Sequence, residues 1–285
     1  MKPLKAILLS VILSLLLFSC KTKVPDIKLS RTDDAALLFG FLNPDADTIT
    51  IALSLAKGVS NHKEKTISFE DLEQAEVKLE HNGQSINLTF LKVLDDQAWG
   101  GDNRRFVFYA LRSQFPVLPG ETYSVSARNK DIFALQSIVT VPAKEFDFDY
   151  EVTGPFNRPD GQAEHKVNVK VLDPENTISF MRALVQYKDQ YSVYNMSDEA
   201  SQPEREPDGS IMFSFFYFRQ VPGSGRESIL SVSNISESYY RYMKSIENGD
   251  GENGNPFAEP TTMYTNIEGG YGVFAALCVK SKKIE

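Results

Sequence analysis

The stretch AEVKLEHNGQSINLTF, residues 75–90, decides the fold. Apolar and polar residues alternate on both sides of its centre, which is the period-two pattern of a β-strand with one buried face. Asn82-Gly83 separates the two alternating runs. A type I′ turn needs positive φ at both central residues, and Asn-Gly meets that need well. The sequence therefore predicts an antiparallel β-hairpin.

The same alternation recurs along most of the chain. Further strands are predicted at residues 36–41, 49–55, 105–111, 122–128, 135–141, 167–171, 181–187, 211–217 and 272–280. Many short strands separated by turn residues are typical of immunoglobulin-like sandwiches. The predicted fold class is mainly β, with two tandem antiparallel β-sandwich domains. Pro142 marks the boundary between an N-terminal β-sandwich, residues 29–142, and a C-terminal β-rich domain, residues 143–285.

One short helix is predicted in the C-terminal domain. Ser236 is a favourable N-cap residue, and Tyr239 and Met243 fall on one helical face. Gly249 ends the helical pattern. The polar, proline-containing stretch 189–208 is predicted to be a long loop between two strands.

The N-terminus carries the pattern of a bacterial lipoprotein signal. Two lysines precede an apolar run, residues 6–18, that is too short to span a bilayer comfortably. Cys20 follows the run at the position where such a signal is cleaved and the thiol receives acyl chains such as palmitate. We expect residues 1–19 to be a signal peptide and residues 20–28 a lipidated tether that holds the protein at a membrane. An ordinary secretory signal with an incidental cysteine is the alternative.

Composition narrows the possible partners. The 285 residues are 42% hydrophobic, which is enough for real cores, and carry a net charge of -8. That acidic balance argues against a nucleic-acid partner.

If Cys20 is acylated, Cys278 is the only other cysteine and no intramolecular disulfide can form. Cys278 lies in an apolar run and is expected to be a buried small hydrophobe.

Catalytic motifs are missing from the sequence. It contains no nucleophile elbow, no HExxH zinc motif, no phosphate loop and no dinucleotide fingerprint. His62, His81 and His165 are scattered. We therefore predict a protein that is not an enzyme and uses no cofactor. A hydrolase of envelope glycans is a less favoured alternative, because two carboxylates distant in sequence can converge in a fold.

Three acidic residues are weak candidates for a metal site. Asp147, Asp149 and Glu151 alternate with aromatic residues, so on a strand their carboxylates share one face. Oxygen ligands of this kind suit calcium. A boundary strand with one solvated face explains the same pattern and is the favoured interpretation, so no metal is predicted.

Aromatic residues are the candidates for an interface. Trp99 is the only tryptophan and lies in a predicted turn, where it either anchors a partner or packs under the loop. Tyr264 and Tyr271 are further candidates, although packing explains their stretch equally well. Residues 213–218 form an almost wholly aromatic strand. Burial on both faces is the favoured interpretation, and one face exposed for a partner is the alternative.

Several strings in the chain resemble a known family. They are LPGETY at 118–123, TVP at 140–142, SYYRY at 238–242, NPFAEP at 255–260 and NIEGGYGVF at 266–274. These strings resemble domain-of-unknown-function family 4249 of Bacteroidota lipoproteins. The resemblance runs over most of the mature chain, and its C-terminal strings are the specific part.

The resemblance implies a location and a class of partner. Members look like lipoproteins of the outer membrane that are often encoded beside TonB-dependent receptors and have no established activity. We therefore expect a non-enzymatic accessory or binding protein, lipid-anchored at the cell outer membrane and working with such a receptor. Which membrane face it occupies is left open. An adhesin or cell-surface structural component is the alternative. Asp47-Thr48-Ile49 has the residue order of an O-glycosylation signal used in Bacteroidota, which makes Thr48 a candidate modification site.

Overall fold

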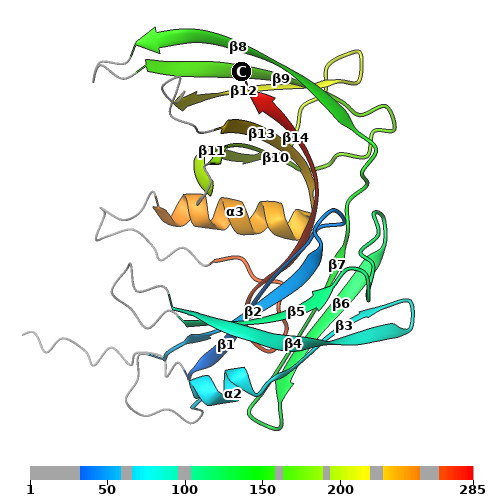
Figure 1. Ribbon diagram of the computed structural model, residues 1–285, viewed down its shortest axis with the longest axis vertical. Coiled ribbons are helices and arrows are strands. Elements are labelled where there is room, and N and C mark those ends of the chain that lie inside the picture. The colour runs from blue at the N-terminus through cyan, green and yellow to red at the C-terminus, as the bar shows by residue number, and fades with distance from the viewer. Residues whose placement is uncertain are drawn as a thin grey trace, which may run out of the picture.

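The computed structural model describes residues 33–58, 66–95, 104–157, 163–188, 193–218, 227–250 and 263–284 (Figure 1). The structure is 62% strand and 8% helix, which confirms the mainly β fold class. The strands of the first half are β1 Ala35–Leu42, β2 Thr48–Ala56, β3 Glu76–His81, β4 Gln84–Asp95, β5 Arg104–Leu111, β6 Thr122–Asn129 and β7 Phe133–Thr140. Those of the second half are β8 Asp147–Asn157, β9 Ala163–Leu172, β10 Met181–Lys188, β11 Val193–Ser201, β12 Ile211–Phe218, β13 Glu227–Ile235 and β14 Tyr271–Ile284. The helices are α2 Phe69–Glu73 and α3 Glu237–Asp250.

Two sheets make up this sandwich-like fold. The larger has 11 strands in the order β11-β10-β13-β14-β1-β2-β5-β4-β3-β6-β7, and the smaller has the order β12-β9-β8. Strands β1 and β14 pair in parallel, with Leu37 beside Tyr271 and Leu42 beside Ala276, whereas the other strand pairs are antiparallel. Strands from both predicted domain ranges therefore share one sheet. The bounds of the two domains, 29–142 and 143–285, stay a prediction.

The core has a different layering in each half. In the first half the large sheet folds over and buries its own inner face, including Leu38, Ile51 and Leu79. In the second half the small sheet covers one face of the large sheet, and Val169 of β9 lies in the same core as Val232 of β13. Helix α3 lies in the concave side of the bent large sheet (Figure 1). Neither helix in the described part of the chain is long and apolar enough to cross a membrane.

Two local predictions are confirmed. Asn82 and Gly83 have φ of 46° and 77°, and they alone connect β3 to β4, as a type I′ hairpin requires. Ser236 caps α3, because its Oγ accepts a hydrogen bond from the N–H of Tyr239 at 3.4 Å. Tyr239 and Met243 face the sheet from this helix, as their spacing predicted.

Three elements differ from the sequence predictions: β11, α2 and β13. No strand was predicted at Glu227–Ile235, where β13 lies. The loop predicted at residues 189–208 is wrong in part, because Val193–Ser201 forms β11 and pairs with β10. Its sequence, VYNMSDEAS, is largely polar and lacks an apolar alternation, and β11 is an edge strand with a single neighbour. The five-residue helix α2 was not predicted. A capping box holds it, in which Ser68 and Asp71 bond each other's backbone N–H groups.

Candidate functional site

A crevice of about 560 Å³ lies between the end of β7 and the start of α3. Ile138 and Thr140 of β7 line one side. Phe180 and the first turn of α3, as far as Arg241, also line it, and the chain before β14 contributes Tyr264. The crevice therefore draws its residues from both halves of the molecule and combines hydroxyl, aromatic, aliphatic and guanidinium groups.

Asn266 shapes the chain next to this crevice. Its side-chain Nδ2 donates to the carbonyl of Phe274 at 2.7 Å, and its Oδ1 accepts from the N–H of Phe274 at 2.9 Å. The side-chain amide thus makes the two hydrogen bonds that a neighbouring strand would make with that residue. This closes the loop between residue 266 and the buried part of β14.

Two glycines in the same string allow a very close backbone approach. Gly269 has φ of +82°, and a Cβ there would lie 2.1 Å from the carbonyl oxygen of Ala134. Gly272 has φ of +110°, and a Cβ there would lie 2.1 Å from the carbonyl oxygen of Leu38. No other residue fits either position without a backbone shift. The NIEGGYGVF string is therefore explained largely by how β14 enters the sheet.

The same segment also pairs with one residue of the outer edge of β7. The N–H of Gln136 donates to the carbonyl of Glu268 at 3.1 Å, and the N–H of Glu268 donates to the carbonyl of Gln136 at 2.9 Å. Ser137 Oγ donates to the carbonyl of Asn266 at 2.7 Å. These bonds tie β7 to the chain that leads into β14. Strand β14 pairs with β1 and so links the two halves in one sheet.

The first turn of α3 is fastened to β14 as well. Ser236 Oγ accepts from the N–H of Ala276 at 3.0 Å, and Ser238 Oγ donates to the carbonyl of Phe274 at 3.1 Å. The SYYRY and NIEGGYGVF strings, which lie far apart in the sequence, therefore meet beside the crevice.

Arg241 and Tyr264 are the two larger polar groups at this meeting point. The Arg241 guanidinium lies 5.9 Å from the centre of the Tyr264 ring and 2.5 Å from Glu237 Oε1. The Arg241 side chain is 58% exposed. Burial raises the pKa of Tyr264, with the positive charge of Arg241 opposing that shift and Glu237 adding to it. The phenol is therefore neutral at physiological pH and can both donate and accept a hydrogen bond.

The LPGETY string has a structural role. Tyr123 Oη donates to the carbonyl of Pro116 at 2.9 Å and accepts from the N–H of Leu118 at 2.8 Å. A tyrosine near the start of a strand that bonds the backbone a few residues upstream is the tyrosine corner of immunoglobulin-like sandwiches. Burial raises the pKa of Tyr123, against the lowering effect of the Leu118 N–H.

The structure places the other predicted interface residues apart. Tyr271 is 55% exposed and begins β14, but it does not line the crevice. Thr48 is exposed at the start of β2 and follows the exposed Asp47, whereas the next residue, Ile49, is buried. Trp99 and the lipidation candidate Cys20 lie outside the described residues. Of the interface candidates that the structure describes, Tyr264 lines the crevice and Tyr271 does not.

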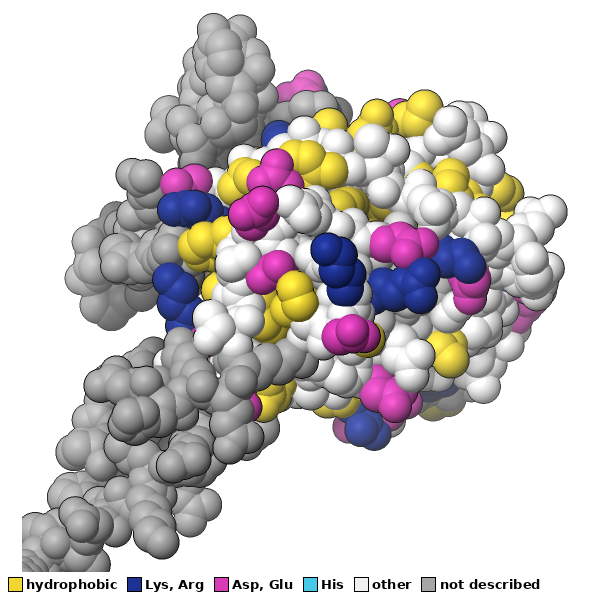
Figure 2. Space-filling view, turned by 90° about the horizontal axis from the view of Figure 1, so that it is seen from below, with side chains coloured by type: hydrophobic (Ala, Val, Ile, Leu, Met, Phe, Trp, Pro, Cys, Tyr) yellow, Lys and Arg dark blue, Asp and Glu magenta, His cyan; other side chains and the backbone are white. Residues whose placement is uncertain are grey.

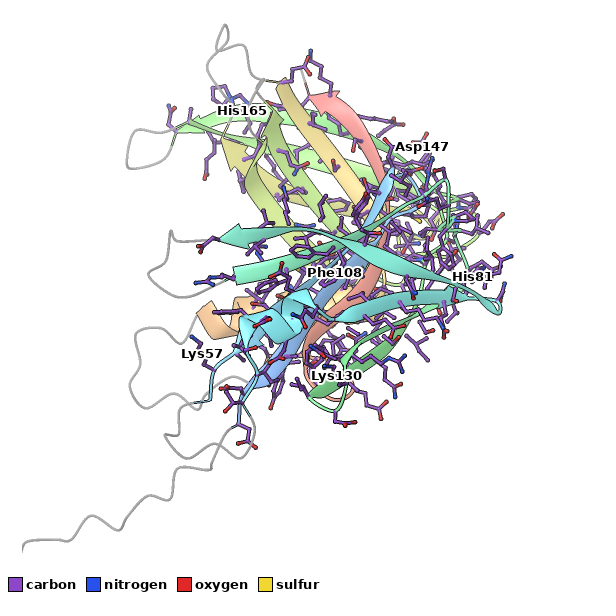
Figure 3. The ribbon with its side chains drawn as sticks, turned by 60° about the horizontal axis from the view of Figure 1, so that its bottom comes forward. Lys57, His81, Phe108, Lys130, Asp147 and His165 are labelled. Carbon is purple, nitrogen blue, oxygen red and sulfur yellow. The ribbon has the colours of Figure 1, made fainter. Side chains whose placement is uncertain are left out.

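The acidic candidates for a metal site lie on the exposed face of β8. Lys282 Nζ of β14 is 3.0 Å from Asp149 Oδ1 and 3.9 Å from Asp147 Oδ1. Glu151 is also exposed. Among the described residues, no three His, Cys, Asp or Glu side chains come together in a way that would hold a metal ion. Figure 3 shows that Asp147 also lies far from His81 and His165.

The aromatic strand β12 is an edge strand with two different faces. Phe215 and Tyr217 point into the core, where they are 6% and 1% exposed. Phe216 points outward and is 50% exposed, with its ring 6.0 Å from that of Phe156. Burial on both faces, the favoured interpretation of this strand, is therefore wrong. The outer face of β12 is exposed because, among the described residues, no third layer covers the small sheet.

A second groove crosses the outer face of β3, β6 and β7, and it carries charges of both signs. Arg128 lies 2.8 Å from Glu76, and Lys78 lies 2.5 Å from Glu80. Figure 2 shows Lys and Arg side chains interspersed with Asp and Glu on the lower face of the molecule. Exposed pairs of this kind contribute little to the free energy of unfolding. Because both signs are interspersed, the groove has no electrostatic potential of a single sign.

Fold and crevice together define a mainly β, sandwich-like protein with a mixed polar and aromatic surface crevice. The family model described as Domain of unknown function (DUF4249) matches residues 22–283. The match covers nearly the whole chain, and the chain belongs to this family. No curated protein matches the chain in sequence.

Sequence reasoning missed most of the crevice. Ile138 and Phe180 carry no motif and meet only because β7 and the chain before β10 converge in the fold. Besides the predicted candidate Tyr264, one further signal was available: Arg241, the charged residue of the SYYRY string.

Proposed function

We propose that this protein is a non-enzymatic binding protein and that the crevice between β7 and α3 is its binding site. One observation carries the proposal: the SYYRY string and the chain that leads into the NIEGGYGVF string converge on this crevice, where Arg241 is exposed and Tyr264 is half-buried. The volume of about 560 Å³ is in the usual range for ligand-binding pockets.

The roles of the residues in these strings support a binding function. Asn266 and Gly272 make contacts that the fold needs. Arg241 pairs only with exposed or half-buried neighbours, and an exposed ion pair stabilises a fold by about 0–1 kcal/mol. Stability therefore does not account for Arg241, which supports the proposed role of this residue in partner contact.

The envelope setting is the second part of the proposal. We propose a lipoprotein anchored through Cys20 at the outer membrane of a Bacteroidota cell, where it assists a TonB-dependent receptor. The apolar run before Cys20 and the family resemblance support this setting. Mass spectrometry of the mature protein is expected to find an acylated Cys20 at the amino terminus. An unmodified Cys20 or an uncleaved leader would contradict the anchor.

Co-purification tests the accessory role. The affinity-tagged full chain, extracted in detergent from the membranes of its own cells, is expected to bring down a TonB-dependent receptor. The double variant Arg241→Ala/Tyr264→Ala should lose the receptor, because it removes the accessible groups of the crevice. The matched control Arg128→Ala/Tyr271→Ala changes the same residue types outside the crevice and should retain it. Recovery of the wild-type chain without any receptor would count against the role.

A structural component of the cell surface is the second candidate. The observation in its favour is the exposed Phe156–Phe216 pair on the small sheet, at the opposite end of the molecule from the start of β1 (Figure 1). If this face joins copies, analytical ultracentrifugation will show self-association that Phe216→Ser abolishes. A monomer at all concentrations would remove the candidate.

We also propose Thr48 as a site of O-glycosylation. Its side chain is exposed at the start of β2, and Asp47 precedes it. The intact mass of the protein from its own cells should exceed that of the acylated chain from residue 20 by a glycan, and Thr48→Ala should lose that increment.

A further inference from the structure

The outer edge of β7 has backbone groups that point away from its neighbour β6. The N–H and C=O of Gln136 both bond Glu268, so the backbone groups of this residue point away from β6. Outward-facing residues alternate along an antiparallel strand, so the backbone groups of Ile138 and Thr140 face outward too. The 2.8 Å contact between the hydroxyls of Thr140 and Thr122 agrees, because side chains approach most closely at non-hydrogen-bonded pairs.

The pairing along this edge stops after Glu268. In the antiparallel register, Asn266 would be the next residue opposite Ile138. Its side chain instead bonds β14, and its carbonyl accepts from Ser137 Oγ. Within the described parts of the chain, no backbone hydrogen bond joins the outward groups of Ile138 or Thr140 to another segment. Two residues of strand edge are therefore available for pairing.

This free edge opens directly on the crevice. Ile138 and Thr140 line it together with Phe180 and Arg241. Ile138 is 66% exposed, the highest value among the exposed large hydrophobic residues that the structure describes. A strand placed beside β7 would satisfy the backbone groups and cover the Ile138 side chain by a cross-strand contact.

We propose that the crevice takes an extended peptide segment of a partner protein, which adds as a strand to β7 at Ile138 and Thr140. The inference rests on the proposed binding function and names the kind of group that is bound. In this mode, main-chain hydrogen bonds supply affinity and alternating side chains supply specificity. The first turn of α3 lines the same crevice. A single extended segment therefore fits there, whereas the sheet edge of a second folded copy would clash with α3.

A synthetic peptide tests the edge directly. The probe is KTVTVTK with blocked ends, labelled with fluorescein, and its binding to the detergent-solubilised full chain is followed by fluorescence polarisation. Two further peptides are N-methylated either at the valines or at the threonines. Only one set of amides faces β7 in a given register. The peptide methylated at that set should bind about tenfold more weakly than the parent, and the other should bind as the parent does. Equal binding of all three, or no binding by the parent peptide, would overturn the proposal.

Matched variants locate the contact. Ile138→Pro removes the outward N–H without touching the β6 ladder, a change that edge strands tolerate. It should lower the affinity for the parent peptide about tenfold. Ile138→Thr keeps the N–H and should bind within about threefold of wild type. If Ile138→Pro does not fold, hydrogen exchange of the wild-type chain decides: the peptide must slow exchange in residues 136–142, and protection elsewhere refutes the proposal.

The receptor experiment separates this inference from the proposed function. A receptor that co-purifies equally with wild type and with folded Ile138→Pro would leave the accessory role intact and reject the β7 edge as its contact. Peptide binding at β7 without any receptor recovered would reject the accessory role and keep the strand-addition site.

Discussion

Tyr123 shows how a single residue fixes the fold of the first half. Its hydroxyl bridges Pro116 and Leu118 from within the core. Tyr123→Phe leaves the Leu118 N–H and the Pro116 carbonyl without that partner, and we expect a loss of about 1–3 kcal/mol in the free energy of unfolding. Urea denaturation followed by circular dichroism measures it. The same change at the exposed Tyr271 is the control and should cost less than about 0.5 kcal/mol.

Cys278 is buried in β14, with Sγ 3.1 Å from the carbonyl oxygen of Pro142. Burial raises the pKa of its thiol to about 12, with Asp45 adding to the shift. The reactive thiolate is therefore almost absent at neutral pH. Iodoacetamide at about pH 8, close to the ordinary thiol pKa, should leave Cys278 unmodified in the folded protein. It should alkylate Cys278 once urea has unfolded the chain. Peptide mapping distinguishes it from Cys20, and alkylation of Cys278 in the native state would contradict this view of the residue.

Asp173 is a buried carboxylate that links two loops of the second half. Burial alone would raise its pKa, but hydrogen bonds from the N–H groups of Ile178 and Thr177 and from Arg205 outweigh burial, so the pKa lies below its usual value. A depressed folded pKa adds stability above the unfolded pKa of about 3.9. That stability is lost as the pH falls through the folded value.

The prediction is that stability declines in acid below about pH 4 and that Asp173→Asn removes part of this decline. At neutral pH the variant should lose about 1.5–3 kcal/mol, because Arg205 loses its charged partner. Urea titrations between about pH 2 and 7 measure both effects. Asp131→Asn, at an exposed position, is the matched control, and an equal effect there would refute the assignment to Asp173.

At the scale of the elements, the entry of β14 depends on Gly272. An alanine there would combine φ of +110° with a Cβ 2.1 Å from the carbonyl of Leu38. Gly209 is the matched control, because its φ is +80° with open space around it. Gly209→Ala should cost about 1–2 kcal/mol from backbone strain alone. Gly272→Ala should cost about 3 kcal/mol or more, since overpacking adds to strain. Equal losses in urea denaturation would show that the close approach to β1 is unimportant.

The same elements show what sequence could and could not predict. The Asn82-Gly83 hairpin and the Ser236 cap were predictable because the residues themselves favour one local backbone conformation. Strand β11 was not, because its pairing with β10 rather than any apolar alternation holds it in the sheet. The crevice was not predictable either. Ile138 and Arg241 are 103 positions apart in the numbering and meet only through the tertiary fold.

At the scale of the whole molecule, the parallel pair β1–β14 makes the two halves depend on each other. These strands lie in the middle of the 11-stranded sheet, with the strands of the first half on one side and those of the second half on the other. Separating the halves would expose the edge of β1 along Leu37–Leu42. Long unpaired edges of this kind promote aggregation.

The full chain should therefore unfold in one calorimetric transition, with equal calorimetric and van't Hoff enthalpies. The fragment 29–142 alone should be insoluble or lack a cooperative melt, because β1 has lost β14. Joining residues 263–285 to this fragment through a Gly-Ser linker restores the missing neighbour and should recover solubility and a melting transition. A cooperative melt of 29–142 alone would show instead that the first sandwich folds by itself, and that β14 is added to a finished edge rather than needed to complete it.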